Sequence, residues 1–337
     1  MMNIIDSIGG IKEQAGKTGS GDIFLTLEDE LKKSMHIFWE KAAQILEGSS
    51  VRLADPPPGY YLLENNFFSA LFLYSFYRAG IKKENRILYS AINQCLRGMV
   101  TGCDNILDDE YKRTLETSLP QKGTRFRSVL DIMVSDRVLF ELSLGAFKEK
   151  EKIIAASVIS LRALVESGYQ EATEEGGINK ILPPDRVLET IHHFKTGILF
   201  KCPWAIPSVI ENMDEEKNKN LNMALYNIGM GCQVMDDMAD LESDIKTKHH
   251  NYVVSLIYHK AGNEIPDDLK ASVLTGKRVS ETNDMLMQYE DVKNKAVEKA
   301  RSYLAAGLNE LFEEKHRFLV EPAIKFLSVR IGVERYF

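Results

Sequence analysis

The spacing of apolar residues is the feature that most constrains the fold of this chain. From Ile23 onward they recur every three or four positions, as in "LEDELKKSMHIFWEKAAQIL" (27–46) and "RSVLDIMVSDRVLFELSLGAF" (127–147). This period places them on one face of an α-helix. No run alternates apolar and polar residues as a half-buried strand would. The pattern therefore predicts an all-α protein of roughly ten or more helices.

Clusters of Gly, Pro and acidic residues interrupt the helical pattern, notably at 55–59, 174–184 and 260–268. Such clusters mark turns and loops. Residues 1–22 are rich in Gly, Ser and Lys, so we expect a flexible N-terminal tail there. Because residues 23–337 contain no internal repeat and no low-complexity tract, the economical expectation for them is a single all-α domain.

Composition excludes several classes of protein. The 337 residues are 44% hydrophobic and carry a net charge of −7. The scattered Lys and Arg residues argue against a nucleic-acid surface. The four cysteines have neither zinc-site spacing nor the pattern of a secreted disulfide framework. Since no window approaches 18 uninterrupted apolar residues, we expect no transmembrane segment and a cytoplasmic protein.

A first acidic cluster lies in "DNILDDE" (104–110). On a helix, Asp104 and Asp108 lie about 40° apart, so their carboxylates can bind one cation together. Asp109 points about 140° away from Asp104 and is the weaker ligand candidate. An apolar stripe is expected to pack into the core beside this pair, formed by Ile92, Leu96, Met99, Cys103, Ile106 and Leu107.

A second acidic cluster lies in "QVMDDMAD" (233–240), where Gln233, Asp236 and Asp240 share one helix stripe and Asp237 flanks it. Hard carboxylate oxygens suit Mg²⁺, which binds through a few carboxylates plus substrate phosphates. Two such clusters facing one cavity would clamp a diphosphate. Each cluster taken alone is equally compatible with a solvated helix face.

A third element lies between them, in "ETIHHFKTGILFKCP" (189–203). Lys195 and Thr196 offer an ammonium and a hydroxyl to phosphate oxygens, and Gly197 lets the helix bend or a ligand approach closely. His192 and His193 are adjacent and therefore lie on different helix faces, which argues against a zinc site.

The three elements, in this order, resemble those of the trans-isoprenyl diphosphate synthase (polyprenyl synthetase) family. The resemblance spans residues 50 to 260 and is carried by "DNILD", "FKTG" and "QVMDDMAD". It implies an enzyme with the all-α isoprenoid synthase fold, whose helices surround a central cavity. It also implies that this cavity binds an allylic prenyl diphosphate through Mg²⁺ and that the protein forms a homodimer.

The resemblance also assigns roles to residues. It implies that Lys195, Thr196 and Gln233 bind the diphosphate and act in catalysis. A further substrate contact is implied for Arg113, and one is expected at Arg97, where the family often has His or Gln. Arg335 and Tyr336 are expected to contact the diphosphate because a similar Arg-Tyr pair is seen near the C-terminus of class I terpene cyclases. The implied metal ligands are Asp104, Asp108, Asp236, Asp237 and Asp240, of which Asp237 matches a motif position but need not bind the metal directly.

The departures from the family concern the first motif and the second substrate. Asn105 stands where the family usually has a second Asp. Residues 53–77 contain no Lys or Arg, although the family carries a Gly-Gly-Lys-x-x-Arg segment there. Thr114 and Leu115 follow Arg113 in place of the rest of an Arg-Arg-Gly segment. The losses fall on the isopentenyl diphosphate site, where Arg97 could restore some anion binding.

We therefore expect a Mg²⁺-dependent class I isoprenoid synthase that ionises an allylic diphosphate and then cyclises it or transfers it to a non-standard acceptor. A conventional head-to-tail polyprenyl diphosphate synthase of the farnesyl or geranylgeranyl type is the first alternative. A head-to-head synthase is another, because Asp-x-x-x-Asp occurs in both acidic segments. The non-enzymatic alternative is a partner subunit without activity of its own.

Overall fold

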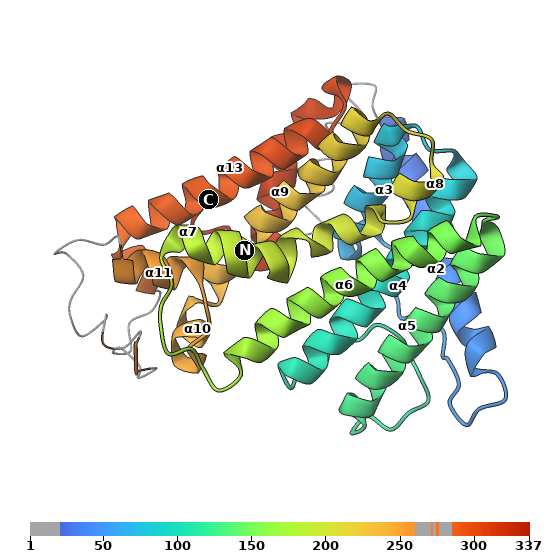
Figure 1. The fold of residues 1–337 in the computed structure, drawn as a ribbon, viewed down its shortest axis with the longest axis horizontal. Helices are drawn as coiled ribbons and strands as arrows, with labels where there is room; N and C mark the ends of the chain where they lie inside the picture. Colours follow the sequence, from blue (N-terminus) through green and yellow to red (C-terminus); the bar gives the residue numbers. More distant parts are fainter. Residues whose placement is uncertain (1–20, 260–270, 272–273, 276–284) are drawn as a thin grey trace. The chain divides into compact units, whose positions relative to one another are not determined.

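A computed structural model describes residues 21–259, 271, 274–275 and 285–337. These residues form 12 α-helices joined by shorter helical turns and loops (Figure 1). They contain no strand, and Leu53 and Thr117 form an isolated bridge. The prediction of an all-α protein is confirmed. No helix within these residues has the length and apolar character needed to cross a membrane.

The predicted flexible tail lies outside the described residues except at its C-terminal end. Helix α2 (Gly21–Leu46) includes the last two residues of the predicted tail, and the rest of that prediction stays untested. The apolar residues of α2 explain its early start, because Ile23, Leu27 and Leu31 are buried and recur every four positions.

The chain divides into two compact units. The N-terminal unit comprises the described part of Lys12–Leu164 together with Cys202–Leu221. The C-terminal unit comprises Val165–Lys201 and the described part of Asn222–Phe337. The single domain and the central cavity expected from the sequence stay predictions.

Three long helices, α2, α4 and α5, pack together in the N-terminal unit. Its elements are α2, η1 (Leu63–Asn65), α3 (Phe67–Ala79), α4 (Lys83–Leu107), α5 (Thr124–Ala146), the first part of α6 (Lys150–Glu174) and α8 (Pro207–Ile210). Two glycines let α4 approach α5 closely. A Cβ on Gly98 would lie 2.2 Å from Ser135 Oγ, and one on Gly102 would lie 2.7 Å from Ile132 Cγ1.

A buried ion pair joins α4 to α2. Glu30 is fully buried and accepts hydrogen bonds from Arg86, whose Nε lies 2.8 Å from Glu30 Oε2. Arg86 also donates to the carbonyl of Ile81 just before α4. These contacts fix the start of the helix whose other end carries the first acidic cluster.

The C-terminal unit is built around α13 (Glu290–Leu311) and the part of α9 (Glu215–Ala239) from Asn222 onward, and the two helices run side by side in Figure 1. Its other elements are α7 (Pro184–Arg186), η2 (Val187–Gly197), α10 (Leu241–Thr247), α11 (Tyr252–His259), η4 (Met285–Gln288), η5 (Glu314–Leu319) and α14 (Val320–Ile331). The short helix η3 (Leu199–Trp204) crosses the unit boundary. A Cβ on Gly307 of α13 would lie 2.6 Å from the carbonyl oxygen of Ala224, so the glycine permits the close contact with α9.

Candidate active site

Lys195 and Thr196 lie on η2, which is a π-helix of 11 residues. Its wider turn is seen directly after its end, where the N–H of Ile198 donates to the carbonyl five residues back, at His193, over 2.9 Å. π-Helical turns are rare and are often found at functional sites. The sequence correctly predicted a helix here, but its periodicity gave no sign of the wider turn.

Gly197 ends η2 at a point of close packing. A Cβ there would lie 2.5 Å from the ring carbon Cε2 of Tyr226 and 3.1 Å from Met230 Sδ. We expected this glycine to bend the helix or to admit a ligand. Within the C-terminal unit, its observed role is to let η2 lie against α9.

The second acidic cluster lies where α9 ends and α10 begins. Asp236 and Asp240 are both exposed and lie on successive turns, with the N–H of Asp240 donating to the carbonyl of Asp236 over 2.8 Å. Asp240 immediately precedes α10. Two exposed carboxylates one turn apart are a donor set that Mg²⁺ accepts, with phosphate oxygens or water completing its shell.

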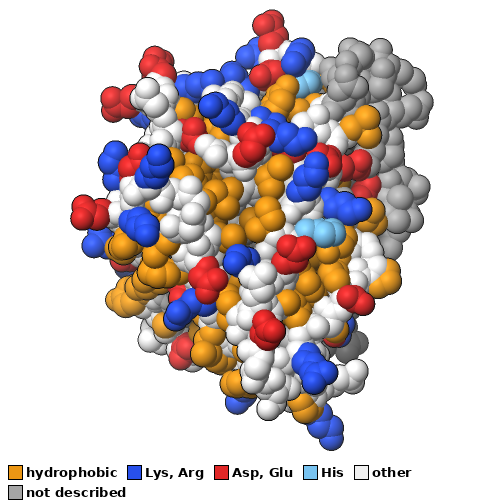
Figure 2. Space-filling model, turned by 90° about the vertical axis from the view of Figure 1, so that its right-hand side faces the viewer, with side chains coloured by type: hydrophobic (Ala, Val, Ile, Leu, Met, Phe, Trp, Pro, Cys, Tyr) orange, Lys and Arg blue, Asp and Glu red, His pale blue; other side chains and the backbone are white. Residues whose placement is uncertain are grey.

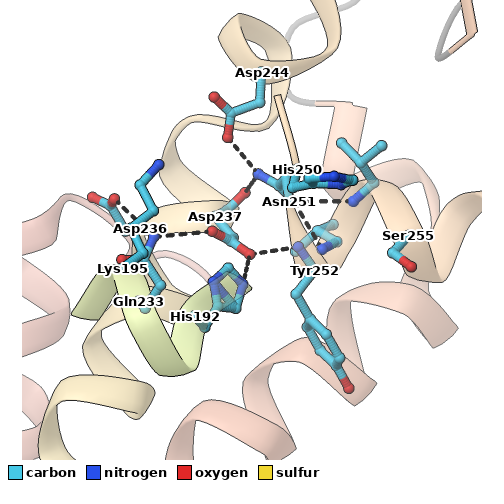
Figure 3. A network of polar contacts seen from close by, with 12 residues as sticks. His192, Lys195, Gln233, Asp236, Asp237, Asp244, His250, Asn251, Tyr252 and Ser255 are labelled. Carbon is cyan, nitrogen blue, oxygen red and sulfur yellow. Dashed lines mark hydrogen bonds and ion pairs between the residues drawn. The ribbon is translucent and has the colours of Figure 1, made fainter. Parts of the chain in front are cut away.

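Gln233 joins η2 to this cluster (Figure 3). The Thr196 hydroxyl donates to Gln233 Oε1. The Gln233 amide nitrogen lies 3.4 Å from Asp236 Oδ2 and 3.3 Å from Asp237 Oδ1, so it donates to both carboxylates. The structure thus brings together the predicted residues Thr196, Gln233 and Asp236 from two separate segments.

Asp237 faces the interior, unlike Asp236. It is 2% exposed, and its Oδ2 accepts the backbone N–H of Tyr252 and lies 2.8 Å from His192 Nε2 (Figure 3). Burial raises the pKa of Asp237 well above its usual value and lowers the pKa of His192 to about 3. These contacts favour a supporting role for Asp237, and its predicted role as a metal ligand stays untested.

Lys195 is surrounded by carboxylates. Its Nζ lies 2.7 Å from Glu171 Oε1 on α6. Burial alone would lower the pKa of Lys195, but Glu171, Glu174 and Asp244 raise it above its usual value. Lys195 therefore stays protonated, and a diphosphate reaching it must compete with Glu171. The sequence gave no signal for Glu171, because nothing in its own segment relates it to Lys195.

Asn251 is a further residue that sequence reasoning missed. Its Oδ1 accepts the N–H groups of Val253 and Val254, which caps the start of α11. Its Nδ2 donates to the carbonyl of Asp237 and to Asp244 Oδ2, both over 2.8 Å. An Asn directly before an apolar helical run is a typical N-cap signal, so this residue could have been found.

The first acidic cluster ends α4 in the N-terminal unit. Asp104 is half-buried and Asp108 is exposed, and the N–H of Asp108 donates to the carbonyl of Asp104 over 2.8 Å. Asn105 is buried, where its side chain donates to the carbonyl of Lys112 and accepts the N–H of Lys112 over 2.9 and 2.7 Å. An Asp carboxylate at this position could accept the N–H of Lys112 but could not donate to its carbonyl. The Asn side chain makes both hydrogen bonds and so holds the loop that follows α4.

The apolar stripe beside this cluster is only partly buried. Ile92, Leu96 and Met99 belong to the core, as predicted. Cys103 is exposed, and Ile106 and Leu107 are 39% and 40% exposed, so the prediction was wrong for the last turn of α4. In that turn Asn105 is the buried residue, because its side chain faces the following loop and bonds the backbone of Lys112.

The predicted cationic contacts lie in different surroundings. Arg97 donates to Asn66 Oδ1 over 2.7 Å, and Arg113 pairs with Glu116 over 2.6 Å. Arg335 donates to the hydroxyl of Tyr336 over 2.7 Å, with its guanidinium 4.8 Å from the centre of the Tyr336 ring. Asp109 pairs with Arg125 over 3.1 Å, in keeping with its ranking as the weaker ligand candidate.

The predicted site residues therefore fall into two groups. Lys195, Thr196, Gln233, Asp236 and Asp240 belong to the C-terminal unit, whereas Asp104 and Asp108 belong to the N-terminal unit. Among the described residues, no three His, Cys, Asp or Glu side chains are placed to hold a metal ion by themselves. The meeting of both acidic clusters around one diphosphate stays a prediction.

Comparison with known proteins relates the chain to enzymes of prenyl diphosphate metabolism. A family model described as polyprenyl synthetase matches residues 181–257, which include η2 and the second acidic cluster. The farnesyl diphosphate synthase of Micrococcus luteus is 26% identical over 233 residues, covering 64% of this chain and 72% of that protein.

Solved structures match over nearly their whole length. A polyprenyl synthetase from Streptomyces coelicolor A3(2) has a TM-score of 0.64 at 15% identity, covering 90% of this chain and 99% of that one. A geranylgeranyl pyrophosphate synthetase from Pyrococcus horikoshii has a TM-score of 0.58 at 20% identity, covering 96% and 98%. The chain thus has the isoprenoid synthase fold and is similar to enzymes of the polyprenyl synthetase family.

Proposed function

We propose that the protein is a Mg²⁺-dependent isoprenoid synthase that ionises an allylic prenyl diphosphate. The observation that carries this proposal is the linked group of Lys195, Thr196, Gln233 and Asp236, with Asp236 and Asp240 exposed on successive turns. An ammonium group, a hydroxyl group and two solvent-exposed carboxylates lie in one region, and these are the groups that bind a metal-bound diphosphate.

Each side chain has a separate task in this proposal. Asp236 and Asp240 hold Mg²⁺, which when bound neutralises diphosphate oxygens and stabilises the departing pyrophosphate. The Lys195 ammonium binds a diphosphate oxygen after Glu171 releases it. The Thr196 hydroxyl donates to another oxygen after it turns from Gln233, whose amide still donates to Asp236. Once these contacts to the diphosphate have formed, the groups stabilise its developing negative charge.

The first acidic cluster is the second predicted metal-binding pair. Asp104 and Asp108 have the same one-turn spacing as the second pair, and Asp108 is exposed. We propose that they hold further Mg²⁺ against the same diphosphate. Arg113 lies nine positions after Asp104 and contributes to diphosphate binding once it parts from Glu116.

Head-to-tail chain elongation is the reaction that the comparisons favour. The relatives include a farnesyl diphosphate synthase and geranylgeranyl pyrophosphate synthetases. In this version, the allylic cation is attacked by isopentenyl diphosphate, and Arg97 is the candidate cation for that second diphosphate. Arg97 would then exchange its bond to Asn66 for one to the substrate.

One observation favours the second candidate, cyclisation or transfer to a non-standard acceptor. Residues 53–77 contain no Lys or Arg, and Thr114 follows Arg113 where a second cation is expected. A diphosphate carries several negative charges and is held in proteins mainly by cationic side chains and metal ions. The two candidates differ in whether isopentenyl diphosphate is consumed.

The homodimer is also part of the proposal. Helix α5 carries Phe126, Val129, Met133 and Phe140, all exposed and spaced by three, four and seven positions along one helix face. Hydrophobic patches also appear among the charged side chains on the face shown in Figure 2. Exposed apolar faces of this kind mark association surfaces. The cytoplasmic location and the absence of a nucleic-acid partner stay predictions.

Binding of Mg²⁺ and pyrophosphate tests the proposal. A ligand that binds only the folded protein raises its thermal stability. We expect inorganic pyrophosphate with Mg²⁺ to raise the unfolding temperature, and pyrophosphate with EDTA or Mg²⁺ alone to do so far less. The measurement is thermal unfolding of the full chain. Equal stability with and without Mg²⁺–pyrophosphate would contradict the proposed site.

A further inference from the structure

Four side chains of the C-terminal unit form a closed ring between η2 and α9. His192 and Thr196 lie four positions apart on η2, and Gln233 and Asp237 lie four positions apart on α9. His192 contacts Asp237, and Asp237 accepts a hydrogen bond from Gln233 (Figure 3). Gln233 in turn accepts a hydrogen bond from Thr196. Because each helix contributes two members one turn apart, the ring fixes the rotation of η2 relative to α9.

The hydrogen bonds in this ring have a defined direction. A carboxylate only accepts, so Asp237 attracts the NH₂ side of the Gln233 amide. The carbonyl side, Oε1, is thereby turned toward Thr196, whose hydroxyl donates to it. The same NH₂ group also reaches Asp236 Oδ2. The position of Asp237 therefore determines the orientation of the Gln233 amide. Through this amide it also determines which groups the Thr196 hydroxyl and the Asp236 carboxylate face.

His192 is the member of the ring that no assigned role explains. Its side chain is fully buried, and its Nε2 lies 2.8 Å from Asp237 Oδ2. Within the described residues, neither ring nitrogen of His192 has a well-aligned hydrogen-bond partner, so the approach of Nε2 to Asp237 is a close polar contact. Burying an imidazole is costly unless its polar atoms are used. An apolar residue could fill the same space but could not make the polar contact with Asp237. This contact is therefore the specific contribution of His192.

Asp237 is held from a third direction by α11. The backbone N–H of Tyr252, the first residue of that helix, donates to Asp237 Oδ2. Asn251 caps the same helix and donates to the carbonyl of Asp237. Gln233 donates to Oδ1 of the carboxylate, whereas the Tyr252 N–H and His192 both approach Oδ2. His192 thereby links Asp237 to the helix of Lys195.

We propose that His192 is a positioning residue, which holds Asp237 so that Gln233, Thr196 and Asp236 keep the geometry needed to bind a metal-bound diphosphate. This inference rests on the proposed function, because it assigns Thr196 and Asp236 to that ligand. Groups behind metal ligands orient them, and replacing such a group typically lowers metal affinity about 10- to 100-fold.

The test compares two amides at position 192. In His192→Gln the amide nitrogen lies where Nε2 lies and can still reach Asp237. In His192→Asn it lies nearer the place of Nδ1 and cannot. His193→Asn is the matched control, because His193 is the next residue on η2 and its ring contacts the Tyr226 hydroxyl at 2.9 Å instead of Asp237.

Thermal unfolding of each full-length variant is followed while Mg²⁺ is titrated at fixed pyrophosphate. We expect the Mg²⁺ concentration for half-maximal protection to rise at least about tenfold in His192→Asn. In His192→Gln it should stay within a few-fold of the wild type, and His193→Asn should match the wild type. His192→Phe, which keeps the ring volume, replaces His192→Asn if that variant does not fold.

The possible outcomes are distinct. Equal Mg²⁺ dependence in His192→Asn and His192→Gln, with only the unliganded stability changed, would show a purely structural histidine and overturn the inference. An absence of protection in the wild type would overturn the proposed function and the inference together. Loss of Mg²⁺ affinity in His193→Asn equal to that in His192→Asn would also overturn it, because the effect would then not pass through Asp237.

Discussion

Asp236→Ala and Asp240→Ala are each expected to lower kcat/KM for an allylic diphosphate by about a thousandfold, while the protein stays folded. Removing one group that stabilises developing charge typically costs about 10²–10³ in rate, and removing a metal ligand adds the loss of the metal's own stabilisation. Both carboxylates are exposed, and the buried Gln233 amide that donates to Asp236 also donates to Asp237, which stays in place. The measurement is pyrophosphate release with Mg²⁺ in excess.

Glu242 provides the matched control for this prediction. It is an exposed carboxylate just after Asp240, in the first turn of α10. Glu242→Ala changes the net charge in the same way but removes no predicted ligand, so its kcat/KM should stay within about twofold of the wild type. If all three variants lost activity equally, the effect would come from overall charge, and the assignment of Asp236 and Asp240 would be wrong.

Asp237→Ala is expected to act mainly on stability, lowering the free energy of unfolding by about 3 kcal/mol. The substitution leaves the buried Tyr252 N–H without its acceptor and removes the Gln233 hydrogen bond and the His192 contact to the same carboxylate. Each unsatisfied buried group costs about 1–3 kcal/mol, which exceeds the gain from no longer burying a carboxyl group. The measurement is chemical denaturation of the unliganded protein.

The adjacent residue of the same motif gives the comparison. Asp236→Ala should change the free energy of unfolding by less than about 0.5 kcal/mol, as is usual for an exposed site. The two neighbouring aspartates would thus separate into one that acts on metal binding and one that acts on stability. Similar destabilisation by both substitutions would contradict the buried role of Asp237.

The sequence predicted those features that local spacing determines. The three- and four-residue period predicted an all-α chain, and the one-turn spacing of Asp236 and Asp240 placed both on one exposed side of the chain. The four-residue step from Gln233 to Asp237 likewise brings their side chains into contact along α9. Such relations follow from helix geometry alone.

Contacts between segments far apart in the chain could not be predicted in the same way. Glu171 reaches Lys195 from another helix, and His192 reaches Asp237 across 45 positions, 237 minus 192. His192 is followed by another histidine in an apolar segment, and nothing in this local sequence indicates that its partner is a buried carboxylate. The π-helical turn of η2 was equally hidden, because its wider turn depends on how the segment packs against α9.

Asn105 illustrates a third case, in which a departure from a family pattern has a local cause. Judged by charge alone, replacing an Asp with Asn weakens a metal site. In the structure, the residue is buried and bonds both backbone groups of Lys112, a task that needs a donor and an acceptor on one side chain. The neighbouring Asp104 and Asp108 remain the candidates for the metal.

The most direct test of the central claim is product analysis of the purified protein with Mg²⁺ and geranyl, farnesyl or geranylgeranyl diphosphate, each with and without isopentenyl diphosphate. We predict Mg²⁺-dependent release of pyrophosphate from at least one allylic diphosphate. Longer prenyl diphosphates would identify the acceptor as isopentenyl diphosphate, whereas a hydrocarbon or alcohol formed without it would identify cyclisation or another acceptor. Release of no pyrophosphate from any of the three, under either condition, would contradict the claim.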